Sequence, residues 1–163
     1  MMTTTKTKTR VLVVDDSTFV RHAVTRMLES AADIEVVGTA ADGREAIEKA
    51  RELRPDVISL DIKMPRMDGL EALPLILAER PVAVLLLSSL THEGGDITLR
   101  GLELGALDFL DKSSAQGNMN LLSLADELVA KIRLLAAVPR ERLAPAAAAP
   151  AVAEPMRPVF APR

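Results

Sequence analysis

The sequence predicts an α/β fold in which one parallel five-stranded sheet is covered by helices on both faces. Two patterns lead to this prediction. Short apolar runs recur along the chain, and several are continuous rather than alternating, as in strands buried on both faces. Segments with helical periodicity separate these runs, so that a strand is followed by a helix five times. Right-handed crossovers then predict a doubly wound α/β sandwich.

Each expected element has its own pattern in the chain. The apolar runs that predict strands are residues 11–14, 34–37, 57–60, 82–87 and 106–110. The first helix is predicted by an apolar stripe made of Phe19, Val20, Ala23, Val24, Met27 and Leu28. A second stripe comprises Ala46, Ile47, Ala50 and Leu53. The last helix has one apolar face, formed by Leu121, Leu124, Ala125, Leu128, Val129, Ile132 and Leu135.

Two helix starts carry further signals. Asp42 followed by Glu45 resembles a capping box at the start of the second helix. The third helix is expected to begin near Asp68, which places Pro74 inside it. Proline removes an interior hydrogen bond, so we expect a kink or a later start there. Gly101 also weakens the helix that precedes the last strand.

The length, net charge and composition of the chain limit the classes of function. The 163 residues allow one domain with a short appendage: we expect a flexible N-terminus over 1–9, a domain over 10–138 and an Ala/Pro-rich linker or disordered tail over 139–163. The net charge of -3 and the lack of a basic cluster argue against nucleic-acid binding. Without cysteine there is no disulfide or zinc-thiolate site. With neither a membrane-length apolar run nor a signal peptide, we expect a cytoplasmic protein that does not bind membranes.

Acidic residues follow two of the predicted strands. The first strand runs into Asp15 and Asp16, and the third runs into Asp61. In the flavodoxin-like strand order 2-1-3-4-5 these strands are neighbours, and ligands bind beyond their carboxyl ends. Such an oxygen-rich cluster suits Mg²⁺, and a carboxylate can act as a nucleophile that forms an aspartyl phosphate. Ser88 and Lys112 end the next two strands, where they would hold phosphoryl oxygens.

Four motifs in this sequence resemble those of a known family. VLVVDDS, LDIKMPRMDG, LLLSSLT and GALDFLDK resemble the receiver domain of two-component response regulators, a phosphorelay family. The likeness covers about residues 10–137 and is greatest to the receiver of the chemotaxis protein-glutamate methylesterase. The resemblance implies that Asp61 is the phosphoacceptor and that Asp15, Asp16 and Asp61, with the backbone carbonyl of Lys63, bind Mg²⁺. It also implies switch roles for Ser88 and Phe109, and pairing of Lys112 with the phosphoryl group, although Phe109 could equally be a core strand residue.

The same resemblance implies partners. A histidine kinase, of chemotaxis type, would donate the phosphoryl group, and output would pass through the surface formed by the fourth helix, the fifth strand and the fifth helix. The output partner is open, because it is either a separate protein or a C-terminal effector domain that is missing from this chain. His22 and His92 are expected on the surface, His22 in a helix and His92 in a loop, and neither follows a Gly-x-Ser-x-Gly turn. We therefore expect a protein that is not an enzyme, beyond supporting its own Mg²⁺-dependent phosphotransfer and dephosphorylation.

Two positions depart from the family pattern. Ser113 follows Lys112 where the family usually has proline, and Lys63 stands where methylesterase receivers more often have an acid. The Lys63 ammonium could screen the acidic pocket or hinder the water that hydrolyses the aspartyl phosphate. The resulting hypothesis is a longer-lived phosphorylated state.

Two alternatives remain open, and the sequence argues against two others. The chain could be an adaptor with the same fold that is never phosphorylated, or the regulatory part of a chemotaxis methylesterase that lacks its catalytic domain. A magnesium-dependent phosphohydrolase of the haloacid-dehalogenase type would need a second acid at position 63, which is lysine. A flavin-binding module would need a stacking residue, and the chain has no Trp or Tyr.

Overall fold

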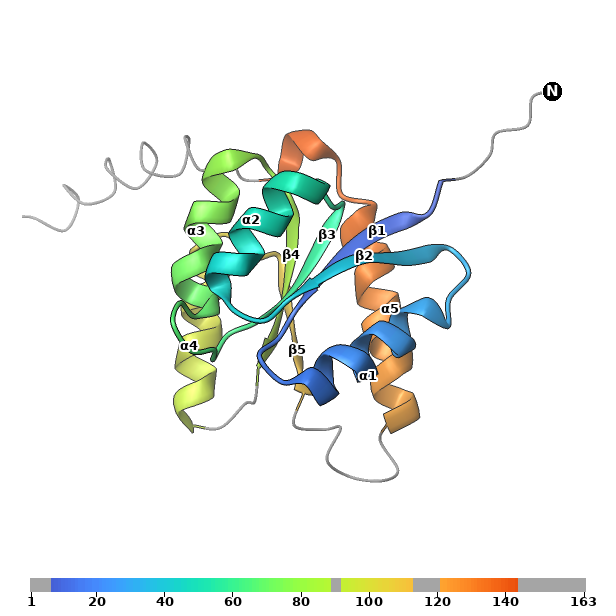
Figure 1. The fold of residues 1–163 in the computed structure, drawn as a ribbon, viewed down its shortest axis with the longest axis horizontal. Helices are drawn as coiled ribbons and strands as arrows, with labels where there is room; N and C mark the ends of the chain where they lie inside the picture. The colour runs from blue at the N-terminus through green and yellow to red at the C-terminus, as the bar shows by residue number, and fades with distance from the viewer. Residues whose placement is uncertain (1–6, 89–91, 113–120, 144–163) are drawn as a thin grey trace, which may run out of the picture.

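The computed structural model describes residues 7–88, 92–112 and 121–143 (Figure 1). Five parallel strands form one sheet in the order β2-β1-β3-β4-β5, as the sequence predicted. The strands are β1 (Thr9–Val14), β2 (Ile34–Ala40), β3 (Val57–Asp61), β4 (Ala83–Ser88) and β5 (Asp108–Asp111). The helices are α1 (Thr18–Glu29), α2 (Gly43–Leu53), α3 (Gly69–Glu79), α4 (His92–Glu103) and α5 (Leu121–Ala136).

Helices cover both faces of the sheet, and each face has its own core (Figure 1). One core lies between the sheet and α2, α3 and α4, and contains Leu12, Ile58, Leu60, Leu86 and Leu73. The other lies between the sheet and α1 and α5, and contains Val11, Val13, Leu85, Leu28 and Leu128. Because successive strand residues point to opposite faces, continuous apolar runs supply both cores at once.

The helix starts follow the expected capping chemistry with two differences. Asp42 accepts a hydrogen bond from the backbone N–H of Glu45 over 2.8 Å, but the Glu45 carboxylate accepts from Ala41 rather than from Asp42. The reciprocal capping box occurs instead at α3, between Asp68 and Glu71. α3 also begins at Gly69 and continues through Pro74, so the later start considered from the sequence is wrong.

Parts of the predicted N-terminus and tail lie outside the described residues, as does Ser113. Within the expected tail, Arg140–Arg142 forms a 3-10 turn and Leu143 is buried against the core under α5. None of the described helices is both long and apolar enough to cross a membrane.

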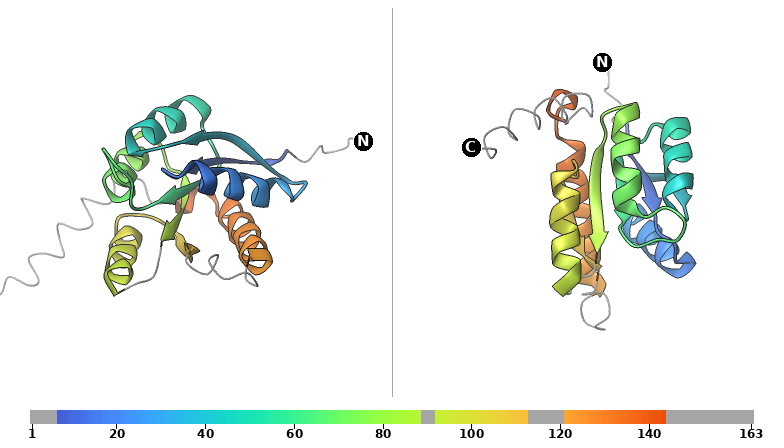
Figure 2. Two further views of the ribbon diagram at one scale, coloured as in Figure 1. Left: turned by 60° about the horizontal axis from the view of Figure 1, so that its bottom comes forward. Right: turned by 90° about the vertical axis from the view of Figure 1, so that its left-hand side faces the viewer.

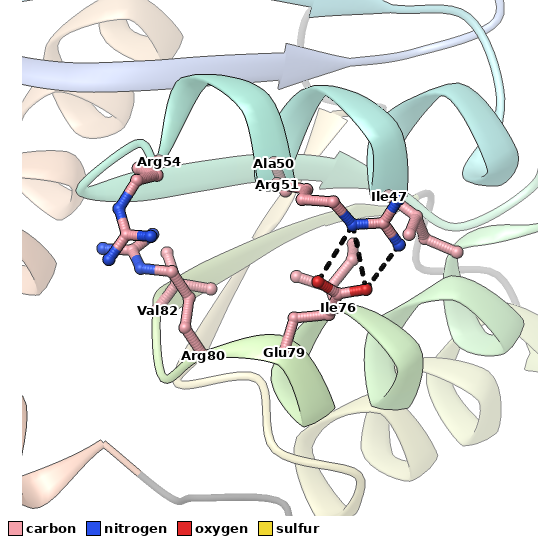
Figure 3. Close-up of a pocket in the computed structure, with 8 residues that line it drawn as sticks. All are labelled: Ile47, Ala50, Arg51, Arg54, Ile76, Glu79, Arg80 and Val82. Carbon is pink, nitrogen blue, oxygen red and sulfur yellow. Dashed lines mark hydrogen bonds and ion pairs between the residues drawn. The ribbon is translucent and has the colours of Figure 1, made fainter.

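A small pocket lies at the edge of the sheet where the strands begin (Figure 3). It is lined by the ends of α2 and α3, and Arg51 of α2 is paired there with Glu79 of α3. Arg80 donates to the backbone carbonyl of Pro55 over 3.0 Å, which holds the start of β4 close to the start of β3. These charges have partners within the fold, and the candidate site lies at the opposite edge.

Candidate functional site

The acidic residues lie together at the carboxyl edge of the sheet. The strands of the sheet end toward the bottom of Figure 1, and the left view of Figure 2 brings that side forward. Asp61 is the last residue of β3, and Asp15 directly follows β1, its neighbour in the sheet. The backbone N–H of Asp15 donates to the carbonyl of Ala40 over 3.0 Å, which ties the end of β1 to β2. The parallel arrangement therefore brings together carboxylates that are distant in sequence.

Burial differs within this cluster. Asp15 and Asp61 are only 1% and 2% exposed, whereas Asp16 is exposed. One carboxylate oxygen from each of the three lies within 4.8 Å of the others. Repulsion between two unit charges at such a separation is roughly 4 kcal/mol at an effective dielectric of about 20. The cluster therefore requires compensating positive charge.

Lys112 supplies part of that charge. Its Nζ donates to Oδ1 of Asp61 over 2.9 Å and to Oδ2 of Asp15 over 3.3 Å. Lys112 directly follows β5, at the far edge of the sheet from β2, so its side chain reaches back across β4. The predicted acids and the predicted lysine thus meet in one group.

The electrostatics of Asp61 reflect this surrounding. Burial disfavours its charged form and, with the negative charges of Asp15 and Asp16, raises its pKa to about 6, against the opposing effect of Lys112. For Lys112, burial acts to lower the pKa, but the bonds and charges of Asp61 and Asp15 outweigh it and raise the pKa above the ordinary value. Near neutral pH the pair is therefore an ammonium beside a carboxylate that is readily protonated below pH 6.

The loop after β3 carries Lys63, whose side chain is exposed. The loop is held at several points, since Gly69 N–H donates to Ile62 carbonyl over 2.7 Å and Gly43 N–H donates to Met67 carbonyl over 2.8 Å. Arg66 Nε also donates to Oδ2 of Asp42 over 2.6 Å. The hydrogen bond from Glu45 N–H and the Arg66 guanidinium lower the pKa of Asp42. The loop backbone near Asp61 is thus anchored to the start of α2.

Gly69 is a residue whose part in the site the sequence analysis missed. A Cβ at this position would lie only 2.3 Å from the backbone carbonyl oxygen of Asp61. Only glycine permits this approach of the α3 start to the end of β3. The Asp-Gly pair within MPRMDG was the available signal.

Ser88 is the last residue of β4, as the sequence predicted, and the structure shows that it is buried. Its Oγ is 2.7 Å from Oγ1 of Thr98 in α4, a partner that the sequence analysis did not identify. Phe109 is half-buried, pairs in register with Leu86 and packs against the core shared with α4. Strand alternation therefore places Phe109 and Ser88 on the same face of the sheet.

Both histidines lie in helices. His22 is exposed in α1, as expected. His92 is the first residue of α4, so its expected place in a preceding loop is wrong. Thr91 directly precedes His92 in the sequence and is a residue type favoured at helix N-caps, so it was the available signal for this start.

The residues present fit a hard divalent cation. Mg²⁺ prefers oxygen ligands, usually one or two carboxylates, with water completing its coordination. Asp15, Asp16 and Asp61 supply three carboxylates with mutually close oxygens. One of them is exposed, which leaves the cluster open to solvent water. The described residues thus contain an acidic pocket of the kind that Mg²⁺ occupies.

Comparisons with known proteins agree with this geometry. The family profile described as response regulator receiver domain matches residues 11–122. A protein-glutamate methylesterase/protein-glutamine glutaminase from Pyrococcus abyssi is 48% identical over 142 residues, covering 87% of this chain and 39% of that protein. One of the same name from Archaeoglobus fulgidus is 56% identical over 127 residues, covering 78% and 36%.

Solved structures of response regulator domains are also similar to this chain. The response regulator domain of Thermotoga maritima CheB is 47% identical, has a TM-score of 0.74, and the match covers 81% of this chain and 98% of that one. A chain of the CheX-CheY-BeF3-Mg complex from Borrelia burgdorferi is 35% identical with a TM-score of 0.58, covering 63% and 77%. The match to a CheB domain extends over almost the whole of that domain.

These relatives correct one expectation. The sequence led us to expect a protein that is not an enzyme, because neither histidine follows a nucleophile motif. The curated relatives are instead named as enzymes, a methylesterase and glutaminase. The chain spans 37% to 39% of the length of three of these curated relatives. The expectation is therefore wrong, since it was drawn only from motifs within this stretch of chain.

Proposed function

Because the chain belongs to the response regulator receiver domain family, we propose that Asp61 accepts a phosphoryl group from a phosphohistidine of a partner kinase. One observation carries this assignment. The buried Asp61 carboxylate lies 2.9 Å from the ammonium of Lys112, in the cluster with Asp15 and Asp16. A nucleophile, a cation and additional carboxylates at one sheet edge are the parts that phosphoryl transfer requires.

In the proposed step, a carboxylate oxygen of Asp61 attacks the phosphorus in line with the bond to the imidazole nitrogen. The new P–O bond forms as the P–N bond breaks, and the imidazole nitrogen keeps the electron pair and takes up a proton. Lys112 Nζ, already directed at this carboxylate, stabilises the charge on one phosphoryl oxygen. The Ser88 hydroxyl is proposed to bind a second phosphoryl oxygen once it turns toward Asp61.

We propose that the same acidic cluster binds Mg²⁺. Asp15, Asp16, Asp61 and the backbone carbonyl of Lys63 would hold Mg²⁺, which supplies positive charge to the transferring phosphoryl group when bound. The exposed Asp16 provides the solvent-side carboxylate. Anchoring of the following loop through Arg66 and Asp42 would keep the Lys63 carbonyl in place.

Phosphorylation would be read out through a change of surface. We propose that the added charge biases a two-state rearrangement of Ser88, Phe109 and the face formed by α4, β5 and α5. The kinase is proposed to be of chemotaxis type, because the relatives include chemotaxis response regulators. The controlled output is proposed to be a protein-glutamate methylesterase activity, the activity for which the curated relatives are named. In this assignment residues 10–138 are the receiver, 139–163 the linker, and the protein acts in the cytoplasm.

The test is incubation with a small phosphodonor and Mg²⁺, followed by intact mass measurement. We expect one added phosphoryl group in the parent, none in Asp61→Asn and none when a chelator removes Mg²⁺. Asp56→Asn is the matched control, because Asp56 is an exposed aspartate at the opposite edge of the sheet. An unmodified parent under every donor would instead favour the adaptor that is never phosphorylated.

A further inference from the structure

The buried hydrogen bond between Ser88 and Thr98 links the candidate site to α4. The two hydroxyl oxygens lie 2.7 Å apart, and the residues are only 5% and 3% exposed. Ser88 ends β4, whereas Thr98 lies in the middle of α4. A direct hydrogen bond between buried side chains thus joins β4, the strand next to the proposed phosphoacceptor, to α4, the helix that packs on β4.

The direction of this bond is away from Asp61. In β4, Leu86 belongs to the core under α4 and Leu87 to the core under α1 and α5, so strand alternation places Ser88 on the α4 face. In β3, Leu60 belongs to the α4-side core, so Asp61 leaves the strand toward the other face. The register pairs Asp61 with Leu87, one residue from Ser88. The Ser88 hydroxyl is therefore adjacent to the site but directed toward α4.

Close contact between α4 and β4 makes this bond possible. Gly101 lies one turn after Thr98, and a Cβ there would lie 2.4 Å from Cδ1 of Leu86. Leu86 precedes Ser88 by two residues and shares its face. The glycine thus lets the helix approach the strand on the side where Thr98 meets Ser88.

We propose that Thr98 is a positioning residue that holds the Ser88 hydroxyl toward α4 until Asp61 is phosphorylated; this rests on the function proposed above. Either hydroxyl can be the donor in the bond between Ser88 and Thr98, but the Ser88 oxygen can occupy only one position at a time. Thr98 and a phosphoryl oxygen on Asp61 therefore compete for the same side chain. A hydrogen bond to an anionic oxygen is the stronger one, so phosphorylation draws Ser88 away from α4. Release of the bond between Ser88 and Thr98 removes a direct link between β4 and α4, which favours a shift of the helix.

A purely structural bond would affect stability and nothing else. The distinguishing variant is Thr98→Val, which keeps the branched shape and removes the hydroxyl, and Thr98→Ser is the control that retains it. With Mg²⁺ and beryllofluoride as the phosphoryl analogue, we expect Thr98→Val to bind several-fold more tightly than the parent, up to roughly tenfold. Thr98→Ser should stay within about twofold of the parent, because its hydroxyl can still engage Ser88.

A double-mutant cycle isolates the competition. In a Ser88→Ala background, Thr98→Val should leave beryllofluoride affinity unchanged, because no hydroxyl remains to be released. An equal gain in both backgrounds, or no gain with Ser88 present, overturns the proposal.

If Thr98→Val does not fold, NMR of the parent decides: beryllofluoride must shift the Thr98 methyl resonance, and an unmoved resonance overturns the proposal. Failure of the parent to take up a phosphoryl group would instead count against the proposed function.

Discussion

Lys112 donates a hydrogen bond from Nζ to Oδ1 of Asp61 over 2.9 Å, although the two residues are 51 positions apart in the chain. The bond joins the end of β5 to the end of β3 across β4. It places a cation against a buried carboxylate that has another carboxylate, Asp15, nearby. The stability of the site depends on this contact, and so does the proposed phosphoryl transfer to Asp61.

Replacement of Lys112 by methionine should destabilise the metal-free protein. The change leaves Asp15 and Asp61 buried without their cation, and loss of one partner of a buried pair costs roughly 3–5 kcal/mol. Because Lys112 is 28% exposed, we expect a smaller loss of about 1–3 kcal/mol in the free energy of unfolding. Urea denaturation in the presence of a chelator measures it.

The control for this substitution is Lys131→Met. Lys131 is also paired with an aspartate, Asp108, over 2.9 Å, but that aspartate is 35% exposed. We expect a loss below about 1 kcal/mol there. Equal losses for the two lysines would show that the charge of Lys112 has no special part in holding the acidic cluster.

Stability of the metal-free protein should fall as pH rises through 6. Burial raises the folded-state pKa of Asp61 to about 6, above its value of about 3.9 in an unfolded chain. Folding therefore favours the protonated form. The stabilising contribution is complete below about pH 4, decreases as pH rises toward 6 and is gone above that value, with a magnitude of about 3 kcal/mol.

Asp61→Asn tests this sign. The variant lacks the titrating group, so its free energy of unfolding in chelator should exceed that of the parent at pH 7.5, and the difference should shrink toward pH 4. Denaturation curves at several pH values give the comparison. Parallel pH profiles for parent and variant would contradict the assignment of the raised pKa to Asp61.

Mg²⁺ should raise the melting temperature at neutral pH. Binding to the folded state alone stabilises in proportion to the logarithm of metal concentration over its dissociation constant. Asp16→Asn should lose most of this rise, and because Asp16 is exposed the variant should still fold. Asp56→Asn should respond as the parent does, and an unchanged response in Asp16→Asn would remove Asp16 from the proposed metal site.

Lys63→Glu should shorten the lifetime of the phosphorylated state. Lys63 is exposed and follows Asp61 by two positions, so its ammonium can screen the phosphoryl group or hinder the attacking water. Loss of labelled phosphate after removal of the donor measures the rate. Lys63→Gln separates charge from shape, and a rate in Lys63→Glu that is unchanged or slower than in the parent refutes the idea.

The strands and the site edge were predictable because they depend on local patterns, whereas the strand order was taken from the flavodoxin-like fold. Continuous apolar runs identified the buried strands, and the acids that follow two of them identified the carboxyl edge. The boundaries were less accurate, since β5 begins at Asp108 and not at Ala106. Pro74 was interpreted as a reason for a kink or a late start, and the late start is wrong because the capping box of Asp68 and Glu71 holds the first turn of α3 ahead of the proline.

The sequence by itself determined the fold class, the family likeness and which residue types end each strand, because these are recorded in periodicity and in contiguous motifs. Only the tertiary structure decided what those side chains contact. It directed Lys112 to both Asp61 and Asp15, required glycine at position 69 beside the Asp61 carbonyl, and paired Ser88 with Thr98. Each of these contacts joins separate elements, and their distances follow from how helices pack on the sheet, which no local pattern encodes.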